Sequence, residues 1–362
     1  MKVFVYGATG FVGGLIARSL LDKGHDVVVA GRDAVRVAAR AAELGVEHSC
    51  TVWVHDPLAL REAMTGSDLV VSCAGPFATI GQAVLEAALA AGAHYVDTAE
   101  EQQFVRNTYE RYESHARNTK RTVVNAMAFE AAMGDWAAAD LARAMGTDAI
   151  DEIALYYGAD DQDAGKLSAD RAMQRRGWVW SVDRWQHQTP GAETRMVDFG
   201  SELGQRTTVS FPSCELITIP RHVSAHRVQS FISMFGSSPM ARGFARMSAV
   251  LGPTLPALMA TPLGALAGRR GPASYAAPSE AERRAATFAL IAECRGGFHR
   301  ERIAIRGADI YGLTVEIVGM AAEMIESGGA PTGVTTPAQL IPAEEALPAL
   351  AERCQLTIEK SY

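Results

Sequence analysis

The feature that most constrains the fold is the opening run VFVYGATGFVGGLIARSL, residues 3–20. It begins with apolar, β-branched residues, which predict a strand buried on both faces. Three glycines follow at a spacing of three residues, and leucine and isoleucine then recur at helical intervals. A strand, a glycine turn and a helix in this order form the first half of a dinucleotide-binding βαβ unit. We therefore expect a parallel α/β sheet at the start of the chain.

Each glycine of this turn has a physical reason to be there. Gly7 permits the tight turn, Gly10 lets backbone N–H groups approach a pyrophosphate, and Gly13 lets the helix pack close to the strand. The helix N-terminus offers unpaired N–H groups and the positive end of its dipole to phosphates. The predicted cofactor contacts are Gly7, Thr9, Gly10, Phe11, Val12 and Gly13. The alternative is a glycine-rich turn that holds no ligand.

The tip of the second strand indicates which dinucleotide is bound. This strand is expected over His25 to Ala30, followed by Gly31-Arg32-Asp33. NAD enzymes usually place an acidic side chain here, on the ribose 2′-hydroxyl. A guanidinium instead pairs with a 2′-phosphate, so Arg32 favours NADP. NAD stays open, because a small turn of the loop would bring Asp33 to the ribose, and Arg32 could also simply cover the solvent edge.

Composition excludes several classes of protein. The net charge of −7 argues against a nucleic-acid partner, which would require a basic surface. The five cysteines are widely spaced with no C-x-x-C pair, and the nine histidines form no H-E-x-x-H motif, so we expect reduced thiols and no metal site. We also expect no signal peptide and no integral membrane segment, and hence a cytoplasmic protein.

The pattern of elements predicts two sheets. Up to about residue 125, strands alternate with helices, as in a doubly wound parallel sheet. After residue 150 longer strands follow, including a hairpin across Gly296-Gly297, so a mostly antiparallel sheet is expected. The predicted fold class is α/β: an N-terminal Rossmann sheet with an inserted α+β domain. The expected domains are 1–130, 131–330 with a flexible flap near 237–285, and 331–362, which returns to the first domain.

Several short motifs, in order, resemble one family. They are YGATGFVG and AGR near the start, CAGPF at 73–77, AGAHYVD at 91–97, DFG at 198–200, ADIYGLT at 308–314 and GVTTPAQ at 333–339. The chain resembles the saccharopine dehydrogenase-like oxidoreductases, including the trans-acting enoyl reductase branch. The resemblance implies a Rossmann domain, an inserted domain whose sheet covers the substrate cleft, NAD(P), hydride transfer and a homodimer.

The chain departs from the family pattern close to the expected nicotinamide position. Where the family often has Asp-x-x-Gly-Glu, this chain has Glu100 in place of the glycine, although Glu101 matches. A Gly-Phe-Asp of the family is Ala128-Phe129-Glu130 here, and Asp135 matches the following aspartate. The substrate of the family therefore does not transfer to this chain.

The CAGPF motif follows a strand at its carboxyl end, which is where ligands bind in open α/β sheets. We expect its loop to pass over the cofactor ribose and nicotinamide, with contacts from Cys73, Ala74, Gly75 and Pro76. Phe77 could pack on the ring. The alternative is a hydrophobic strand-to-helix turn, and Cys73 is expected to be a packed residue rather than a nucleophile.

The candidate catalytic residues are Asp97, Glu130 and Tyr156. Asp97 lies at the end of a strand, where a carboxylate acts as a general acid or caps the next helix, as Thr98 is also expected to do. Glu130 is the best candidate for an acid of raised pKa. From its place in the inserted domain, Tyr156 would donate a proton to the substrate or hold a substrate carboxylate. The same roles are open to Tyr157, Arg171 and Arg175. Trp178 and Trp180 are expected to pack on a sheet, with an aromatic substrate wall as the alternative.

These observations predict an NADP-dependent reductase. The resemblance to the family implies that its acceptor would be a polarised C=C or C=N bond in a hydrophobic metabolite or acyl intermediate, a substrate of secondary metabolism. The first alternative is an amino-acid or imine dehydrogenase of the saccharopine type, with Arg171, Arg221 and Arg227 available for substrate carboxylates. The second is a dinucleotide-binding sensor or scaffold without catalysis, suggested by the departures at Glu100 and Ala128.

Overall fold

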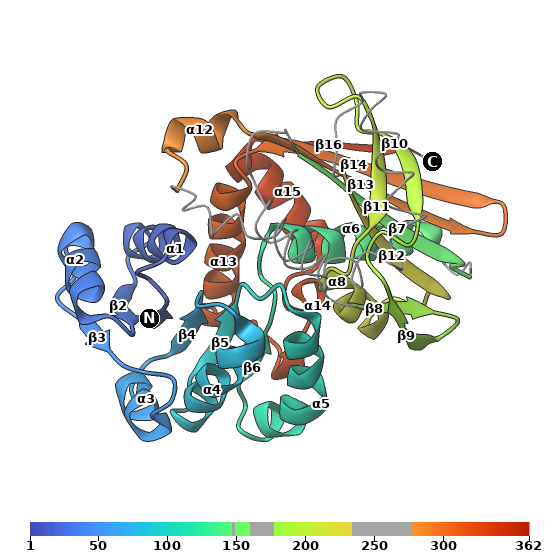
Figure 1. The fold of residues 1–362 in the computed structure, drawn as a ribbon. Helices are drawn as coiled ribbons and strands as arrows, with labels where there is room; N and C mark the ends of the chain where they lie inside the picture. Colours follow the sequence, from blue (N-terminus) through green and yellow to red (C-terminus); the bar gives the residue numbers. More distant parts are fainter. Residues whose placement is uncertain (147–148, 160–176, 234–276, 362) are drawn as a thin grey trace, which may run out of the picture. The chain divides into compact units, whose positions relative to one another are not determined.

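A computed structural model describes residues 1–146, 149–159, 177–233 and 277–361 (Figure 1). The chain divides into two compact units. The first contains Met1–Trp136 and Tyr311–Cys354, and the second contains Ala137–Ile310 and Gln355–Tyr362. Each unit is built around its own sheet. The flap expected near 237–285 lies largely outside the described residues, which resume at residue 277.

The first unit is a parallel sheet with helical connections. Its strands and helices are β1 (Lys2–Tyr6), α1 (Phe11–Asp22), β2 (Asp26–Gly31), α2 (Ala34–Leu44), β3 (Ser49–Thr51), α3 (Pro57–Met64), β4 (Leu69–Ser72), α4 (Phe77–Ala90), β5 (His94–Asp97), α5 (Gln102–Asn118), β6 (Thr122–Val124), the first half of α6 (Phe129–Met145), α13 (Ile310–Glu326), β15 (Gly333–Thr335), α14 (Pro337–Leu340) and α15 (Ala343–Cys354). The seven strands run in the order β3-β2-β1-β4-β5-β6-β15, and all the pairs are parallel. The predicted doubly wound Rossmann sheet is confirmed.

Burial explains why this sheet forms where the sequence indicated. Val3, Phe4 and Val5 are fully buried, as the continuous apolar run requires for a strand covered on both faces. Strand β4 is buried along its whole length, and β5 is buried at all residues but the first. The start of α2 also follows from local chemistry, because Asp33 accepts a hydrogen bond from the Arg36 N–H at the first turn of the helix.

The second unit is built on a larger mixed sheet. Its elements are the second half of α6, β7 (Glu152–Ala159), β8 (Gly177–Ser181), β9 (Arg184–Gln188), β10 (Thr194–Asp198), β11 (Gln205–Ser210), α8 (Glu215–Thr218), the 3-10 turn η1 (Ile219–Arg221), β12 (Arg227–Ser233), α12 (Glu280–Ala285), β13 (Thr287–Gly296), β14 (His299–Ala308) and β16 (Thr357–Ser361). The main order is β10-β11-β12-β7-β13-β14-β16, with β8 pairing β12 and β9 pairing β8. The pair of β12 and β7 is parallel, and the other pairs are antiparallel, so the expected mostly antiparallel sheet is confirmed.

The structure differs from the sequence-based expectation in two details. The hairpin of β13 and β14 turns over Gly297 and Phe298, one residue later than expected, because Gly296 still pairs with His299 and Gly297 adopts a φ of 57°. Only part of the C-terminal segment, expected over 331–362, returns to the first unit. Strand β15 pairs with β6 there, but β16 pairs with β14 in the second sheet.

Candidate functional site

The glycine turn between β1 and α1 is packed too closely for side chains. Gly7 has a φ of 93°, and a Cβ atom on it would lie 2.8 Å from the backbone nitrogen of Ala74. A Cβ atom on Gly13 would lie 2.3 Å from the carbonyl oxygen of Gly7. Cβ atoms in proteins do not come this close to other heavy atoms, so neither position has room for a side chain. The first turn of α1 therefore lies directly against the turn that precedes it. The roles expected for Gly7 and Gly13 follow from this geometry.

The N-terminus of α1 fits a phosphate group. Gly10 is its N-cap residue, and neither a side-chain cap nor an acidic residue occupies the first turn. A Cβ atom on Gly10 would lie 3.2 Å from the Gly7 carbonyl oxygen. Backbone N–H groups at an uncapped helix start bind anions and lie at the positive end of the helix dipole. The residues expected here to contact the cofactor, Gly7, Thr9, Gly10, Phe11, Val12 and Gly13, therefore form one continuous cradle.

Two arginines flank the tip of β2. Arg32 is exposed directly after the strand, and Arg36 follows one helical turn later in α2. The Nη2 atom of Arg36 donates a hydrogen bond to the Thr9 carbonyl oxygen at 2.9 Å, so this guanidinium lies beside the glycine turn. The Asp33 carboxylate accepts from the Arg36 backbone N–H at 3.1 Å and is engaged as the helix cap. This arrangement favours a phosphate at the ribose 2′ position over a hydroxyl held by Asp33. Arg36 is not among the cofactor contacts expected from the sequence, and its signal there is its spacing of four residues from Arg32.

The CAGPF loop begins where β4 ends and lies against the glycine turn. The Cys73 N–H donates to the Tyr6 carbonyl oxygen at 2.8 Å, and Ala74 contacts Gly7. Gly75 and Pro76 are joined by a cis peptide bond. Burial raises the pKa of the Cys73 thiol to about 12, which opposes a role as a nucleophilic thiolate. Of the four residues expected to contact the cofactor here, Cys73 and Ala74 thus lie next to the glycine turn, and Gly75 and Pro76 follow them in the loop.

Two expectations at this end of the sheet are wrong in detail. Phe77 is 5% exposed, and its ring centroid lies 5.7 Å from that of Phe104, so it packs inside the unit and does not line the loop. Thr98 is not the cap of the following helix, because α5 has Glu101 as its N-cap residue. The Glu101 carboxylate instead accepts a hydrogen bond from the Phe77 N–H at 2.9 Å, at the start of α4.

Asp97 is completely buried and tied to backbone on two sides. One carboxylate oxygen accepts from the N–H groups of Ala99 at 3.0 Å and Ala126 at 2.8 Å. The other oxygen accepts from the Asn125 side-chain amide at 2.7 Å. Burial raises the pKa of Asp97 to about 6, although these hydrogen bonds oppose the rise. The arrangement joins the ends of β5 and β6 and favours a positioning role over direct proton donation.

Glu130 lies in the first turn of α6 and is half-buried. The preceding residue is held in place, because the Phe129 N–H donates to the Thr314 hydroxyl at 3.1 Å. Asp135, further along the helix, is fully buried and accepts a hydrogen bond from the Ala338 N–H at 2.8 Å. Asp135 therefore anchors α14, whereas Glu130 keeps a partly exposed position from which a carboxyl group can exchange protons.

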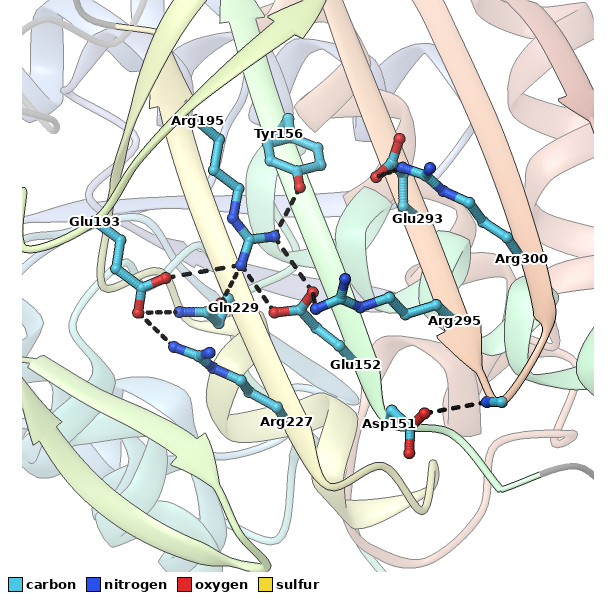
Figure 2. A network of polar contacts seen from close by, with 11 residues as sticks. Asp151, Glu152, Tyr156, Glu193, Arg195, Arg227, Gln229, Glu293, Arg295 and Arg300 are labelled. Atoms are coloured by element: carbon cyan, nitrogen blue, oxygen red, sulfur yellow. Dashed lines mark hydrogen bonds and ion pairs between the residues drawn. The ribbon is translucent and has the colours of Figure 1, made fainter.

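Tyr156 belongs to the second unit, on β7. Its hydroxyl oxygen accepts a hydrogen bond from Arg195 Nη1 at 2.9 Å (Figure 2). Its ring stacks on Phe231 with a centroid separation of 5.2 Å. Burial raises the pKa of Tyr156, so its phenol stays protonated at neutral pH. Tyr157 points to the opposite face of the strand, where its hydroxyl donates to Glu215 at 2.8 Å. Arg171 and Arg175 lie outside the described residues.

Packing and an ion pair engage three further candidates of the second unit, namely Trp178, Trp180 and Arg227. The ring centroid of Trp178 lies 3.8 Å from that of His187, and Trp180 and Trp185 meet edge-on at 4.9 Å, so these rings pair across the hairpin of β8 and β9. Arg227, proposed for a substrate carboxylate, pairs with Glu193 (Figure 2). Arg195 joins Glu152, Tyr156 and Gln229. It was not expected from the sequence, because these residues come from strands that are distant in sequence.

Among the described residues, no group of three or more His, Cys, Asp or Glu side chains is arranged to hold a metal ion. Within the same residues, none of the helices has the length and apolar character needed to cross a membrane.

Comparison with known proteins agrees with this geometry. Residues 3–124 match the saccharopine dehydrogenase NADP-binding domain. A Mycobacterium ulcerans trans-acting enoyl reductase is 30% identical over 159 residues, which are 42% of this chain and 38% of that protein. A trans-acting enoyl reductase of Mycobacterium tuberculosis is 28% identical over 141 residues, 37% of this chain and 33% of its own length. The matched segments thus span about two fifths or less of these curated relatives.

Solved structures extend the likeness to the whole fold. Apo saccharopine dehydrogenase (L-Glu forming) from Saccharomyces cerevisiae superposes with a TM-score of 0.65 at 13% identity, covering 99% of both chains. An amine dehydrogenase from Mycobacterium smegmatis gives a TM-score of 0.50 at 14% identity, covering 94% of this chain and 96% of that one. At these identities the likeness concerns the fold alone. Residues 3–124 thus resemble the saccharopine dehydrogenase NADP-binding domain in sequence.

Proposed function

We propose that this protein is an NADP-dependent reductase that passes a hydride to a polarised C=C or C=N bond in a hydrophobic metabolite or acyl intermediate. The observation that carries the proposal is the contact of Arg36 with an uncapped glycine turn, together with the exposed Arg32 directly after β2. The turn offers backbone N–H groups to a diphosphate, and the arginines offer guanidinium groups to a 2′-phosphate. The names of the mycobacterial relatives, trans-acting enoyl reductases, favour the C=C acceptor.

NADPH, when bound, would supply the hydride, and the chain would supply binding, orientation and a proton. The glycine cradle would hold the diphosphate, while the Cys73–Pro76 loop, packed against Gly7, would border the cofactor. Asp97 would keep the ends of β5 and β6 in register through its three hydrogen bonds. Glu130 is the proposed proton donor, since its side chain is half-buried in the first turn of α6. We also propose a homodimer, on the resemblance to the family.

The proposal is tested by hydride transfer in a single turnover. Purified protein is mixed with one equivalent of NADPH, and absorbance at the nicotinamide band is followed after adding an α,β-unsaturated acyl thioester. Oxidation of NADPH with formation of the saturated acyl group supports the C=C acceptor. Oxidation with cyclic imines or with a keto acid plus an amine, but not with the thioester, would replace it with the saccharopine-type alternative. Tight binding without oxidation in any arm would favour the sensor.

A further inference from the structure

A groove of about 600 Å³ opens on one face of the second sheet, outside the residues assigned to the cofactor. Four arginines line it, together with three acidic residues. The arginines are Arg195 on β10, Arg295 on β13, and Arg300 and Arg302 on β14. All its lining residues belong to the second unit, so it shares none with the glycine turn. Figure 2 shows the polar contacts at its floor.

Two of these arginines face each other across a strand ladder. Arg295 and Arg300 are directly opposite in the antiparallel register of β13 and β14. Like charges in this position destabilise a sheet. Glu152 and Glu293 offset the repulsion in part, each holding one guanidinium at 2.8 Å. The side chains of Arg295 and Arg300 are nevertheless 62% and 66% exposed, so most of their N–H groups face the groove and the solvent.

The carboxylate beside Arg295 already has another partner. Arg195 donates to Glu152 at 2.8 Å, to the Tyr156 hydroxyl at 2.9 Å and to Gln229 at 2.7 Å, and its guanidinium lies 4.5 Å from the centroid of the Phe231 ring. Figure 2 shows this arginine held by Glu152, Tyr156 and Gln229, with Glu193 at 3.7 Å. The charge of Glu152 is thus balanced by Arg195, and Arg295 brings a positive charge in excess.

The carboxylate beside Arg300 is shared in the same way. Glu293 lies 2.8 Å from Arg300 and 3.8 Å from Arg302, so one negative charge meets two positive ones. The third acidic residue, Asp198, uses its carboxylate to accept a hydrogen bond from the Gly200 N–H at 2.9 Å. Among the residues that line the groove, positive charge exceeds negative charge, and the excess lies on exposed guanidinium groups.

We propose that this groove binds a small organic oxyanion, with its carboxylate or phosphate group seated between Arg295 and Arg300. Arginine binds both groups through paired N–H donors, and a bound oxyanion would remove the repulsion across the ladder. Ala154 and Val197 provide an apolar wall for a carbon skeleton. A volume of about 600 Å³ lies in the range of small-molecule sites.

The experiment compares thermal unfolding of the full chain in sodium phosphate and in sodium succinate with unfolding in sodium chloride at equal ionic strength. A ligand that binds the native state raises the unfolding midpoint, whereas screening alone acts equally in all three salts. The test variant is R295Q/R300Q. The matched control is R284Q, because Arg284 is 72% exposed in an ion pair with Glu280 on α12. Exposed pairs of this kind contribute little to stability, so R284Q is expected to fold. The double variant is also expected to fold, because Glu152 keeps Arg195 as a partner and Glu293 keeps Arg302.

Wild type and R284Q are expected to show a higher midpoint in phosphate or succinate than in chloride. The double variant should lose the effect, with an apparent dissociation constant raised by about tenfold or more, as removal of charge-assisted contacts implies. A response to only one of the two anions identifies the group as a phosphate ester or a carboxylate. An equal response of R295Q/R300Q would place anion binding elsewhere, for example at the glycine turn, and would overturn the proposal.

A last arm distinguishes the oxyanion from a second copy of the chain. Sedimentation velocity of wild type and R295Q/R300Q is measured over a range of protein concentrations. The proposal predicts the same sedimentation behaviour for both proteins. No anion effect in wild type, together with a changed association state in the variant, would show that the groove is an interface between copies and would overturn the proposal.

Discussion

The α-carbon of Gly13 lies so close to the Gly7 carbonyl oxygen that a Cβ atom on Gly13 would be 2.3 Å from that oxygen. This contact joins helix α1 to the turn before it and places the N–H groups of the first helical turn where a diphosphate can reach them. The contact involves backbone on one side, so it cannot be relieved by a change of rotamer.

Substitution of this glycine should therefore remove dinucleotide binding. We expect Gly13→Val to weaken NADPH binding by at least about a hundredfold and to destabilise the first unit by about 1–3 kcal/mol, as overpacking does. Gly319→Ala is a suitable control, because the nearest contact there is 3.1 Å to the flexible end of Lys23. Fluorescence titration and chemical unfolding measure the two effects. Full NADPH affinity in Gly13→Val would contradict the packing described for the turn.

The pKa of Asp97 predicts a pH dependence of stability. Its folded value of about 6 lies above the unfolded value, so folding favours the protonated form. The stabilisation of the folded state that comes from Asp97 is therefore fully present below about pH 4 and is lost as the pH rises through about 6. A shift of this size corresponds to about 3 kcal/mol in the free energy of unfolding.

Asp97→Asn should remove this pH dependence and keep the fold. The side-chain carbonyl oxygen of Asn125 has no hydrogen-bond partner among the described residues, so a flip of that amide would let it accept from the amide introduced at position 97. The wild-type stability relative to the variant should fall by up to about 3 kcal/mol between pH 4 and pH 7. Urea unfolding at several pH values gives the difference. A constant difference across this range would show that Asp97 has an ordinary pKa.

Glu130 is tested through turnover and binding together. If it donates the proton, Glu130→Gln should lower kcat by about 10²–10⁴-fold, the usual contribution of a general acid, and leave NADPH affinity unchanged. The dependence of kcat on pH should also change in this variant, and a merely structural role of Glu130 would not produce that change. Glu110→Gln is the control, as Glu110 forms an exposed i,i+4 pair with Arg106 on α5. Unchanged kcat in Glu130→Gln would remove Glu130 from the mechanism.

Tyr156→Phe separates packing from chemistry in the second unit. The variant keeps the ring stacked on Phe231 and removes the hydroxyl that accepts from Arg195. We expect a loss of about 1 kcal/mol in stability, the typical value of one hydrogen bond. NADPH affinity should be unaltered, because the glycine turn belongs to the other unit. A fall in kcat without a change in affinity would show that the phenol takes part in the reaction; a fall in NADPH affinity would contradict the assignment.

The first sheet was predictable because its strands are apolar and buried on both faces, so that Leu69–Ser72 and His94–Asp97 stand out from the helices around them. Strand β12 did not stand out. Its polar residues Gln229 and Ser230 are both 1% exposed, and the hydrogen bonds that make their burial tolerable come from distant strands and loops.

The candidate site was predictable to a similar extent. The glycine turn and Arg32 follow from local spacing. The engagement of Asp33 as a helix cap and the proximity of Arg36 to Thr9 depend on how α2 lies against the turn. The role of Asp97 depends on Ala126, which is brought close by the parallel pairing of β5 and β6. Long-range contacts of this kind leave no periodic signal in the sequence.

The most direct test of the central claim is a fluorescence titration of the purified protein with NADPH and with NADH, repeated with Arg32→Glu and Arg36→Glu. The account predicts tight binding of NADPH, weaker binding of NADH, and a loss of NADPH affinity of about tenfold or more in each variant, with little change for NADH. Equal affinities for the two cofactors, or equal losses in the variants, would show that these arginines do not bind a 2′-phosphate. Binding of neither cofactor would contradict the account as a whole.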